Sequence, residues 1–290
     1  MKAETNGVHV DASLLRGWPL PALDGGGGKE ERGRVLVVGG CEQVPGAARL
    51  AGEAALRVGA GKLQIATADA AAVPLAMAVP EAKVLGLPSD PRGHIRRASG
   101  ALQRDCAHAD AVLVGPGMDD SPLTSKLVEC LLRNATATLV ADAGALCAFP
   151  RVRNRRSPPI LTPHAGEMAA LTGMTATEIG DDAARIATDF AARSGALVVL
   201  KGAVTHIATP EGGLWLHRGG SVGLGTSGSG DVLAGLIAGL LARGATAEQA
   251  AVWGVYLHGR AGEELEAEYG PVGFLAREIS ARVPRLLQTL

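Results

Sequence analysis

The chain has 290 residues, which is enough for one large α/β domain or two small ones. Hydrophobic residues make up 47%, charged residues 20%, and the formal net charge is −1. This balance indicates a compact globular protein and gives no support for nucleic-acid binding or for attachment to an anionic membrane.

Local sequence features argue against zinc-binding, disulfide-rich, secreted and membrane-spanning proteins. The four cysteines are widely spaced with no C-x-x-C pair, so we expect neither a zinc site nor a disulfide framework, and the cytoplasm is the expected compartment. The N-terminus lacks the apolar segment of a secretory signal. No run of about 18 uncharged apolar residues is present that could span a membrane.

In chain order, residues 1–28 end in four glycines and are predicted to be a tail or linker, which leaves 29–290 as a single domain. The first strand is predicted at 34–40, where the continuous apolar run indicates burial on both faces. Further strands are predicted at 62–67, 111–114, 137–141, 159–162 and 196–200, with helices between them at 46–60, 121–133, 166–172 and 177–194. This alternation predicts a mostly parallel sheet with helices on both faces.

The alternation of predicted strands and helices stops late in the chain. Residues 203–218 contain two short apolar segments around a Pro-Glu-Gly-Gly turn and are predicted to form a β-hairpin. Helices are then predicted at 231–243, 246–267 and 274–288. In the first of these, Gly235 and Gly239 form a G-x-x-x-G pattern, which we interpret as close helix packing rather than membrane dimerisation.

Polar or glycine residues follow five of the predicted strands at the point where each ends. They are Gly39–Gly40, Gly115–Gly117, Asp142, Thr162–His164 and Lys201–Gly202. Because ligands of parallel α/β sheets bind beyond the carboxyl ends of the strands, these residues predict one cleft.

The glycine-rich segment 219–231 leads directly into an apolar helix. Its backbone N–H groups, together with the positive end of that helix, are suited to bind a phosphate. Asp231 lies in the first helical turn, where it could deprotonate a substrate hydroxyl. The alternative is a surface loop in which Asp231 only caps the helix. The segment matches neither the Walker A motif nor the dinucleotide fingerprint.

The other candidate residues each have two interpretations. His164 either contacts a ligand or belongs to a strand-to-helix turn, and Asp142 is either structural or organises Mg²⁺ through water. Lys201 either pairs with a nucleotide phosphate or is a structural lysine. The basic segment 151–156 is interpreted as a solvated loop, with docking of a phosphorylated substrate as the alternative. His258, on a helix, is interpreted as a satisfied histidine at the edge of the core.

Ten segments in the order found here resemble one family, the ADP/ATP-dependent NAD(P)H-hydrate dehydratases, a branch of the ribokinase-like fold. The motifs L-T-P-H-x-G-E at 161–167, K-G at 201–202 and G-x-G-D-V-L-A-G at 228–235 carry most of the resemblance. The other segments are 35–40, 45–48, 55–61, 80–81, 115–117, 142–146 and 256–259. The resemblance implies a three-layer αβα sandwich with a mostly parallel central sheet and a late β-hairpin.

The resemblance also implies a reaction. Members of the family restore reduced nicotinamide cofactors whose ring has added water, by phosphorylating the ring hydroxyl and then eliminating phosphate. Bacterial members typically use ADP, with ATP as the other donor, and Mg²⁺ is expected. The expected substrate is the S epimer of NADH hydrate or NADPH hydrate.

Site residues are carried over from the matching motifs. Asp231 is implied to be the catalytic base, and the residues implied to contact the hydrate are Ala47, Gly117, His164 and Asp231. The residues implied to contact the adenine nucleotide are Lys201, Gly202, Ala203, Val204, Thr205 and Gly230.

Two features depart from the family pattern or limit its activity. Gly225-Thr-Ser-Gly228 stands where a run such as Ala-Thr-Gly-Gly is common, although Gly228, Gly230 and Asp231 are in place. Only about 30 residues precede the first predicted strand, so we expect the epimerase activity of fused members to be absent. A homo-oligomer, plausibly a tetramer, is expected from the resemblance and the Ala/Gly-rich helices.

Two other functions are compatible with the same residues. A small-alcohol kinase of the same fold, acting on a vitamin precursor, would leave a stable phosphorylated product. A nucleotide-binding protein without catalysis would retain bound ADP and turn over no hydrate.

Overall fold

The computed structural model describes residues 7–22, 28–151 and 158–290. Residues 152–156 of the basic segment therefore lie outside the described residues, and so does most of the glycine run at 25–28. Within the described part of the chain, no helix is both long and apolar enough to cross a membrane.

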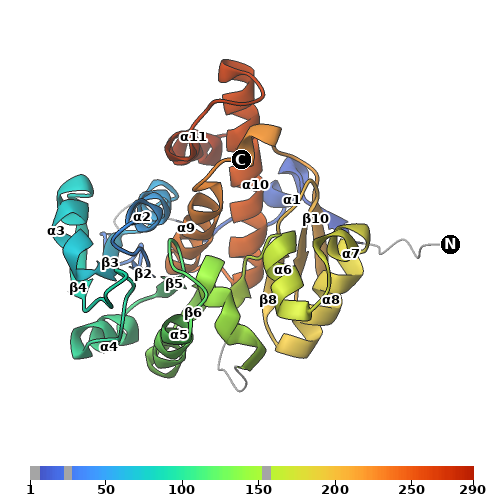
Figure 1. The fold of residues 1–290 in the computed structure, drawn as a ribbon. Helices are drawn as coiled ribbons and strands as arrows, with labels where there is room; N and C mark the ends of the chain where they lie inside the picture. Colours follow the sequence, from blue (N-terminus) through green and yellow to red (C-terminus); the bar gives the residue numbers. More distant parts are fainter. Residues whose placement is uncertain (1–6, 23–27, 152–157) are drawn as a thin grey trace.

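The core of the fold is a ten-stranded sheet in the order β1-β10-β9-β8-β7-β6-β5-β2-β3-β4 (Figure 1). Its parallel part, from β8 to β4, contains β2 (Arg34–Val38), β3 (Lys62–Ala68), β4 (Ala82–Leu87), β5 (Ala111–Val114), β6 (Thr138–Ala141), β7 (Ile160–Leu161) and β8 (Leu197–Leu200). β9 (Thr205–Ala208) runs antiparallel to both β8 and β10 (Leu214–His217). The mostly parallel sheet and the late hairpin are thus confirmed.

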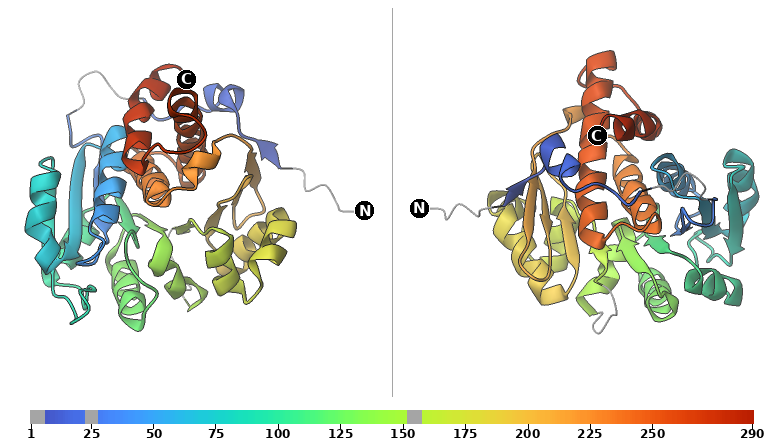
Figure 2. Two further views of the ribbon diagram at one scale, coloured as in Figure 1. Left: turned by 45° about the horizontal axis from the view of Figure 1, so that its top comes forward. Right: turned by 180° about the vertical axis from the view of Figure 1, so that it is seen from behind.

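Helices cover both faces of this sheet, as Figure 2 shows from two further sides. One face carries α2 (Gly46–Arg57), α9 (Ser229–Ala242), α10 (Ala247–Tyr269) and α11 (Ala276–Gln288). The other carries α4 (Gly100–Ala107), α5 (Pro122–Asn134), α6 (Ala165–Thr172) and α8 (Ala183–Ser194). Each layer has its own cluster of buried apolar side chains, because successive residues of the central strands point to opposite faces. The predicted three-layer αβα sandwich is confirmed.

The expectation that residues 1–28 form a tail or linker is wrong for residues 7–22. Here β1 (Val8–His9) adds a parallel strand beside β10, and α1 (Ala12–Arg16) follows it. Trp18 stacks on Trp215 with ring centroids 6.3 Å apart, and its carbonyl oxygen accepts a hydrogen bond of 3.0 Å from Trp253 Nε1. The apolar residues before the glycine run are enough to anchor this segment, since Leu15 is fully buried.

Other elements differ from the sequence prediction at positions of weak local signal. The helix expected at 177–194 is two helices, α7 (Ala176–Asp181) and α8, separated by Asp182 at φ −141°. The edge strand β4 and the helix α3 (Asp69–Ala78) were not predicted. Pro74 interrupts the helical signal of α3, and β4 is only partly buried, so neither segment shows the periodicity of an amphipathic element.

Close packing of α2 against α9 depends on the two glycines of the G-x-x-x-G pattern. A Cβ atom on Gly235 would lie 2.1 Å from the Ala51 carbonyl oxygen, and one on Gly239 would lie 2.4 Å from Val58 Cγ1. Only glycine therefore allows this approach, and the interpretation as a packing motif is confirmed.

We expect Gly235→Ala to lower the free energy of unfolding by about 2 kcal/mol or more, because the added methyl group forces two buried helices apart. Urea denaturation measures the change. Gly180→Ala in α7 is the matched control: no atom lies within 4 Å of its added methyl group, so the substitution is expected to be neutral or slightly stabilising. Equal denaturation midpoints for the two variants would show that the α2–α9 contact is not tight.

Candidate active site

A lysine–carboxylate pair and a threonine that binds it lie at the carboxyl ends of three adjacent strands. Asp142 follows β6, Thr162 follows β7 and Lys201 follows β8. Lys201 Nζ lies 3.0 Å from Asp142 Oδ1, which also accepts a 2.6 Å hydrogen bond from Thr162 Oγ1. The Asp142 side chain is only 4% exposed, so this carboxylate is held almost entirely by protein groups.

Lys201 keeps its positive charge at this site. Burial alone would lower the pKa of Lys201, but the Asp142 and Glu167 carboxylates, with Asp231, raise that pKa above its ordinary value. Glu167 Oε2 lies 3.7 Å from Lys201 Nζ. Because an ammonium has three donors, Lys201 can hold Asp142 and still donate to a phosphate oxygen.

Asp231 occupies the first turn of α9, close to this pair. The N-cap of α9 is Gly228, at φ +90°, so Asp231 is not the capping residue that the alternative interpretation required. A Cβ atom on Gly228 would lie 2.5 Å from Leu50 Cδ1, and one on Gly230 would lie 3.3 Å from Lys201 Nζ. Glycine at both positions therefore lets the loop backbone approach α2 and the Lys201 ammonium.

The environment of Asp231 raises the pKa of its carboxyl group. Its pKa is raised to about 7, because burial removes water from the carboxylate and because Asp142 and Glu167 repel its charge; Lys201 opposes this effect. General bases work best when their pKa lies near the working pH. A carboxyl group with this pKa meets that requirement.

His164 is held by the first turn of α6. Its Nδ1 accepts hydrogen bonds of 3.0 and 3.2 Å from the backbone N–H groups of Gly166 and Glu167, while Glu167 Oε2 accepts one of 2.7 Å from the His164 N–H. Since Nδ1 uses its lone pair here, the neutral ring carries its proton on Nε2. His164 therefore belongs to a strand-to-helix turn and also presents an N–H donor on an exposed ring.

His258 has a supporting position. Its Nε2–H donates to the Ser229 carbonyl oxygen at 3.1 Å and lies 2.9 Å from Ser229 Oγ, at the start of α9. Burial lowers the pKa of His258 to about 4, so the ring is neutral. His258 is thus a neutral, hydrogen-bonded histidine at the start of α9, and it also lines the cavity beside Gly230.

Ala47 and Gly117 are brought together where the strand order reverses between β2 and β5. Gly117 has φ +67°, and a Cβ atom there would lie 2.9 Å from Ala47 Cβ. Ala47 is buried in the first turn of α2, the helix that packs on α9. Such a reversal is a common ligand site in parallel α/β sheets.

A cavity of about 700 Å³, the glycine-loop cavity, lies beside Gly230. Of the residues implied to contact the adenine nucleotide, it is lined by Lys201, Gly202, Ala203, Thr205 and Gly230. Val204 differs: its side chain packs against the buried cluster on the α5 face of the sheet. His164 also lines this cavity, so one of the residues predicted to contact the hydrate is next to the predicted nucleotide site.

Sequence reasoning placed Thr162 in the predicted cleft but did not identify Glu167 as a member of the site. The structure connects both to the Asp142–Lys201 pair. Their positions at the ends of β7 and at the start of α6 were visible, but their partners depend on strand order.

The sequence and fold of this chain are similar to those of known proteins. The sequence pattern of the family described as NAD(P)H-hydrate dehydratase matches residues 35–285. The chain belongs to this family. The ADP-dependent (S)-NAD(P)H-hydrate dehydratase of Xanthomonas campestris pathovar campestris is 53% identical to it, over 97% of this chain and 96% of the relative.

Solved structures agree with this assignment to the dehydratase family. The ADP/ATP-dependent NAD(P)H-hydrate dehydratase from Bacillus subtilis, co-crystallised with ATP and Mg²⁺, superposes with a TM-score of 0.87 at 32% identity, over 98% of this chain and 99% of that one. A ribokinase-like superfamily protein from Enterococcus faecalis superposes with a TM-score of 0.84 at 26% identity, over 100% of this chain and 98% of that one. The fold of this dehydratase is therefore ribokinase-like, as the sequence motifs implied.

Proposed function

We propose that this dehydratase removes water from the S epimer of NAD(P)H hydrate, with ADP as phosphoryl donor, and so restores NAD(P)H. The observation that carries the proposal is the position of Asp231. It follows Gly230 in the chain and is near enough to Lys201 for the ammonium to lower its pKa, and both Lys201 and Gly230 line a glycine-rich cavity of a size that holds a nucleotide. The relative from Xanthomonas campestris and a Bacillus subtilis relative that is 34% identical have this activity in their names.

The first step is phosphoryl transfer. The Asp231 carboxylate accepts the proton of the ring hydroxyl while the hydroxyl oxygen bonds to the terminal phosphorus of ADP and the bond from that phosphorus to AMP breaks. Lys201 and the backbone N–H groups around Gly230 stabilise the negative charge on the transferring group. Gly202, Ala203 and Thr205 line the cavity and orient the nucleotide, whereas the Val204 side chain packs on the α5 face of the sheet and supports this wall from behind.

The second step is elimination. The bond between ring carbon and oxygen breaks, phosphate leaves with the electron pair, and loss of a proton from the neighbouring carbon restores the ring double bond. Ala47 and Gly117 limit the space around the ring, and the Nε2–H of His164 donates a hydrogen bond to the substrate. The products are AMP, phosphate and NAD(P)H.

Asp142 is the residue that would hold the Mg²⁺ of the nucleotide, directly or through water. Thr162 and Lys201 engage its Oδ1, and its Oδ2 faces Gly230 on the side of the glycine loop. Among the described residues there is no group of three or more His, Cys, Asp or Glu side chains that could hold a metal ion by themselves. One carboxylate plus phosphate oxygens is the usual Mg²⁺ arrangement, so the residues fit. When bound, the ion neutralises charge on the phosphates.

Incubation with chemically hydrated NADH, ADP and Mg²⁺ tests this function. We expect the absorbance of reduced nicotinamide to return and one phosphate to be released per cofactor. A stable phosphorylated product would instead identify a small-alcohol kinase. Bound ADP with no turnover would identify a nucleotide-binding protein without catalysis.

Activity is expected to depend on pH through Asp231. Since only the carboxylate accepts the hydroxyl proton, kcat/KM should fall as pH drops through about 7, the pKa of Asp231 in the free protein. Removing the neighbouring negative charge in Asp142→Asn should move this inflection to lower pH. A pH–rate profile measures both. A profile that is flat between about pH 6 and 8 would contradict the role of Asp231 as base.

We also propose that the protein acts in the cytoplasm as a homo-oligomer. The four cysteines form no disulfide bond with one another, which suits a reducing compartment. Exposed apolar side chains such as Val73, Met77 and Val272 are compatible with contacts between subunits. Light scattering after gel filtration measures the assembly, and a monomer at micromolar concentration would contradict it.

A further inference from the structure

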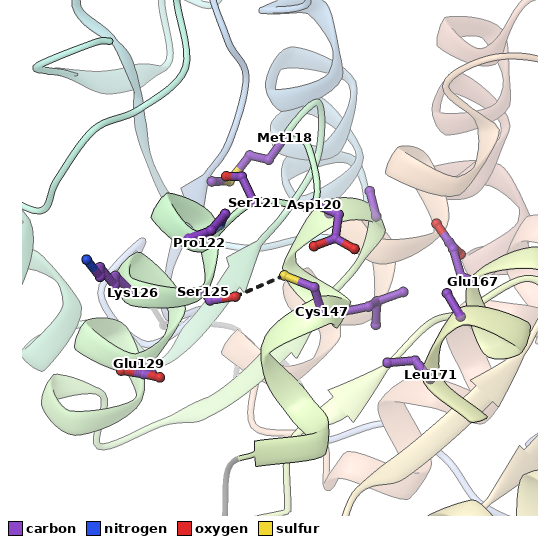
Figure 3. A pocket seen from close by; sticks show the side chains of 14 residues that line it. Met118, Asp120, Ser121, Pro122, Ser125, Lys126, Glu129, Cys147, Glu167 and Leu171 are labelled. Atoms are coloured by element: carbon purple, nitrogen blue, oxygen red, sulfur yellow. Dashed lines mark hydrogen bonds between the residues drawn. The ribbon is translucent and has the colours of Figure 1, made fainter. Parts of the chain in front are cut away.

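A second cavity, of about 790 Å³, meets the active site from the side of α5 (Figure 3). We refer to it as the α5 cavity; it is lined by residues within 118–129, 143–147 and 167–171. Glu167 lines this cavity, whereas Lys201 lines the glycine-loop cavity, and Lys201 Nζ lies 3.7 Å from Glu167 Oε2. Two large cavities therefore meet at one charged cluster.

The proposed reaction has two substrates, and the glycine-loop cavity accounts for ADP. The second substrate is a dinucleotide whose reacting ring must lie at Asp231, so its adenosine end needs a separate place. The α5 cavity begins next to the predicted ring contacts, because Met118 follows Gly117 and Glu167 shares a helical turn with His164. Its volume is within the usual range for small-molecule sites.

The lining of the α5 cavity is chemically suited to a nucleoside. Met118, Leu146 and Leu171 offer apolar surface for a base. Ser125 Oγ lies 3.2 Å from Cys147 Sγ on the same wall, and burial raises the pKa of the Cys147 thiol, which therefore stays neutral. The site is thus suited to binding rather than to covalent chemistry.

The charges of the lining favour hydroxyl groups over phosphate. Three carboxylates, those of Asp120, Glu129 and Glu167, line the cavity, with Lys126 as the single cationic side chain among its described lining residues. Figure 3 shows Asp120 between Cys147 and Glu167, whereas the Lys126 amine is directed away from both. Carboxylates accept hydrogen bonds from ribose hydroxyls and repel a phosphate on the same ribose.

We infer that the α5 cavity binds the adenosine end of the hydrated dinucleotide with a free ribose 2′-hydroxyl, so that NADH hydrate is preferred over NADPH hydrate. This inference rests on the proposed function and adds a specificity-determining site to it. Asp120 is the residue expected to discriminate most, because its carboxylate lies in the lining between Cys147 and Glu167 (Figure 3).

Steady-state kinetics with both hydrates, at saturating ADP, test the preference. We expect kcat/KM to be higher for NADH hydrate by about tenfold or more, and the ratio to fall at high ionic strength, because exposed charges are screened. Asp120→Asn should reduce the ratio severalfold by improving the use of NADPH hydrate. Asp189→Asn is the matched control: this exposed carboxylate pairs with Arg185 on α8, and the ratio should not change.

Filling the cavity provides a second measurement. Leu171→Trp is expected to raise KM for NADH hydrate and to weaken binding of NADH, each by about tenfold, while KM for ADP is unchanged. Equal kcat/KM for the two hydrates, with no effect of Asp120→Asn, would overturn the inference and leave the proposed function standing. Tight NADH binding that Leu171→Trp weakens, with no turnover of either hydrate, would instead support the site and overturn the proposed function.

Discussion

Replacing Asp231 by asparagine is expected to lower kcat by about a thousandfold or more, with ADP binding largely intact. The amide keeps the shape of the side chain but cannot accept the hydroxyl proton, and removal of a general base typically costs factors of this order. The residues proposed to contact ADP, Lys201 to Thr205 and Gly230, are unchanged in this variant. Phosphate release and calorimetric ADP binding measure the two quantities. Near-normal turnover in this variant would remove Asp231 from the mechanism.

The same substitution is expected to stabilise the fold above neutral pH. The pKa of Asp231 is raised from 3.8 to about 7 in the folded protein, so folding favours the protonated carboxyl. Stability is therefore lost as pH rises from about 4 to 7 and the buried group must ionise. Asparagine never ionises, so its stabilising effect should grow by about 2 kcal/mol between about pH 5 and pH 8.

Urea denaturation at the two pH values measures this difference. A stabilisation that does not change with pH would show that Asp231 titrates normally. Together the two results would identify Asp231 as a group that costs stability and serves catalysis.

The second large effect is expected for Lys201→Met, which should lower the free energy of unfolding by about 3 kcal/mol or more and abolish turnover. The substitution leaves Asp142, whose side chain is 4% exposed, as a buried carboxylate without its cation. Adding Asp142→Asn to the same protein should recover much of the stability, because the unpaired charge is removed. Activity should not return, since the phosphate contact is still missing.

An exposed pair provides the matched control. Lys83 Nζ lies 2.9 Å from Asp105 Oδ2, but the Lys83 side chain is 59% exposed. Lys83→Met is therefore expected to change stability by less than about 1 kcal/mol and to leave activity unchanged. Equal losses for Lys83→Met and Lys201→Met would contradict the assignment of Lys201 to a buried pair.

The parallel sheet was predictable because each central strand is a short, continuous apolar run bounded by glycine or polar residues. The meeting of Asp142, Thr162 and Lys201 was predictable in outline, since parallel strands bring their carboxyl ends to one edge. Their pairing was not, because it depends on β6, β7 and β8 being neighbours across 59 residues of sequence.

Properties that arise from burial were harder to predict from the sequence. A lone aspartate has a pKa of about 3.9, which makes it a weak base at neutral pH. The raised pKa depends on desolvation and on the Asp142 carboxylate, and neither is visible in the local motif. In the same way, the segment before the glycine run looked like a tail because its strand partner, β10, lies some 200 residues later in the chain.

The fate of the ring hydroxyl oxygen, followed with an isotope label, tests the proposed chemistry most directly. NADH hydrate labelled with heavy oxygen at the ring hydroxyl is turned over with ADP, and the released phosphate is analysed by mass spectrometry. If Asp231 activates that hydroxyl for phosphorylation, each phosphate carries one labelled oxygen, because the carbon–oxygen bond breaks after the transfer. Label recovered in water, with unlabelled phosphate, would contradict phosphorylation of the ring hydroxyl.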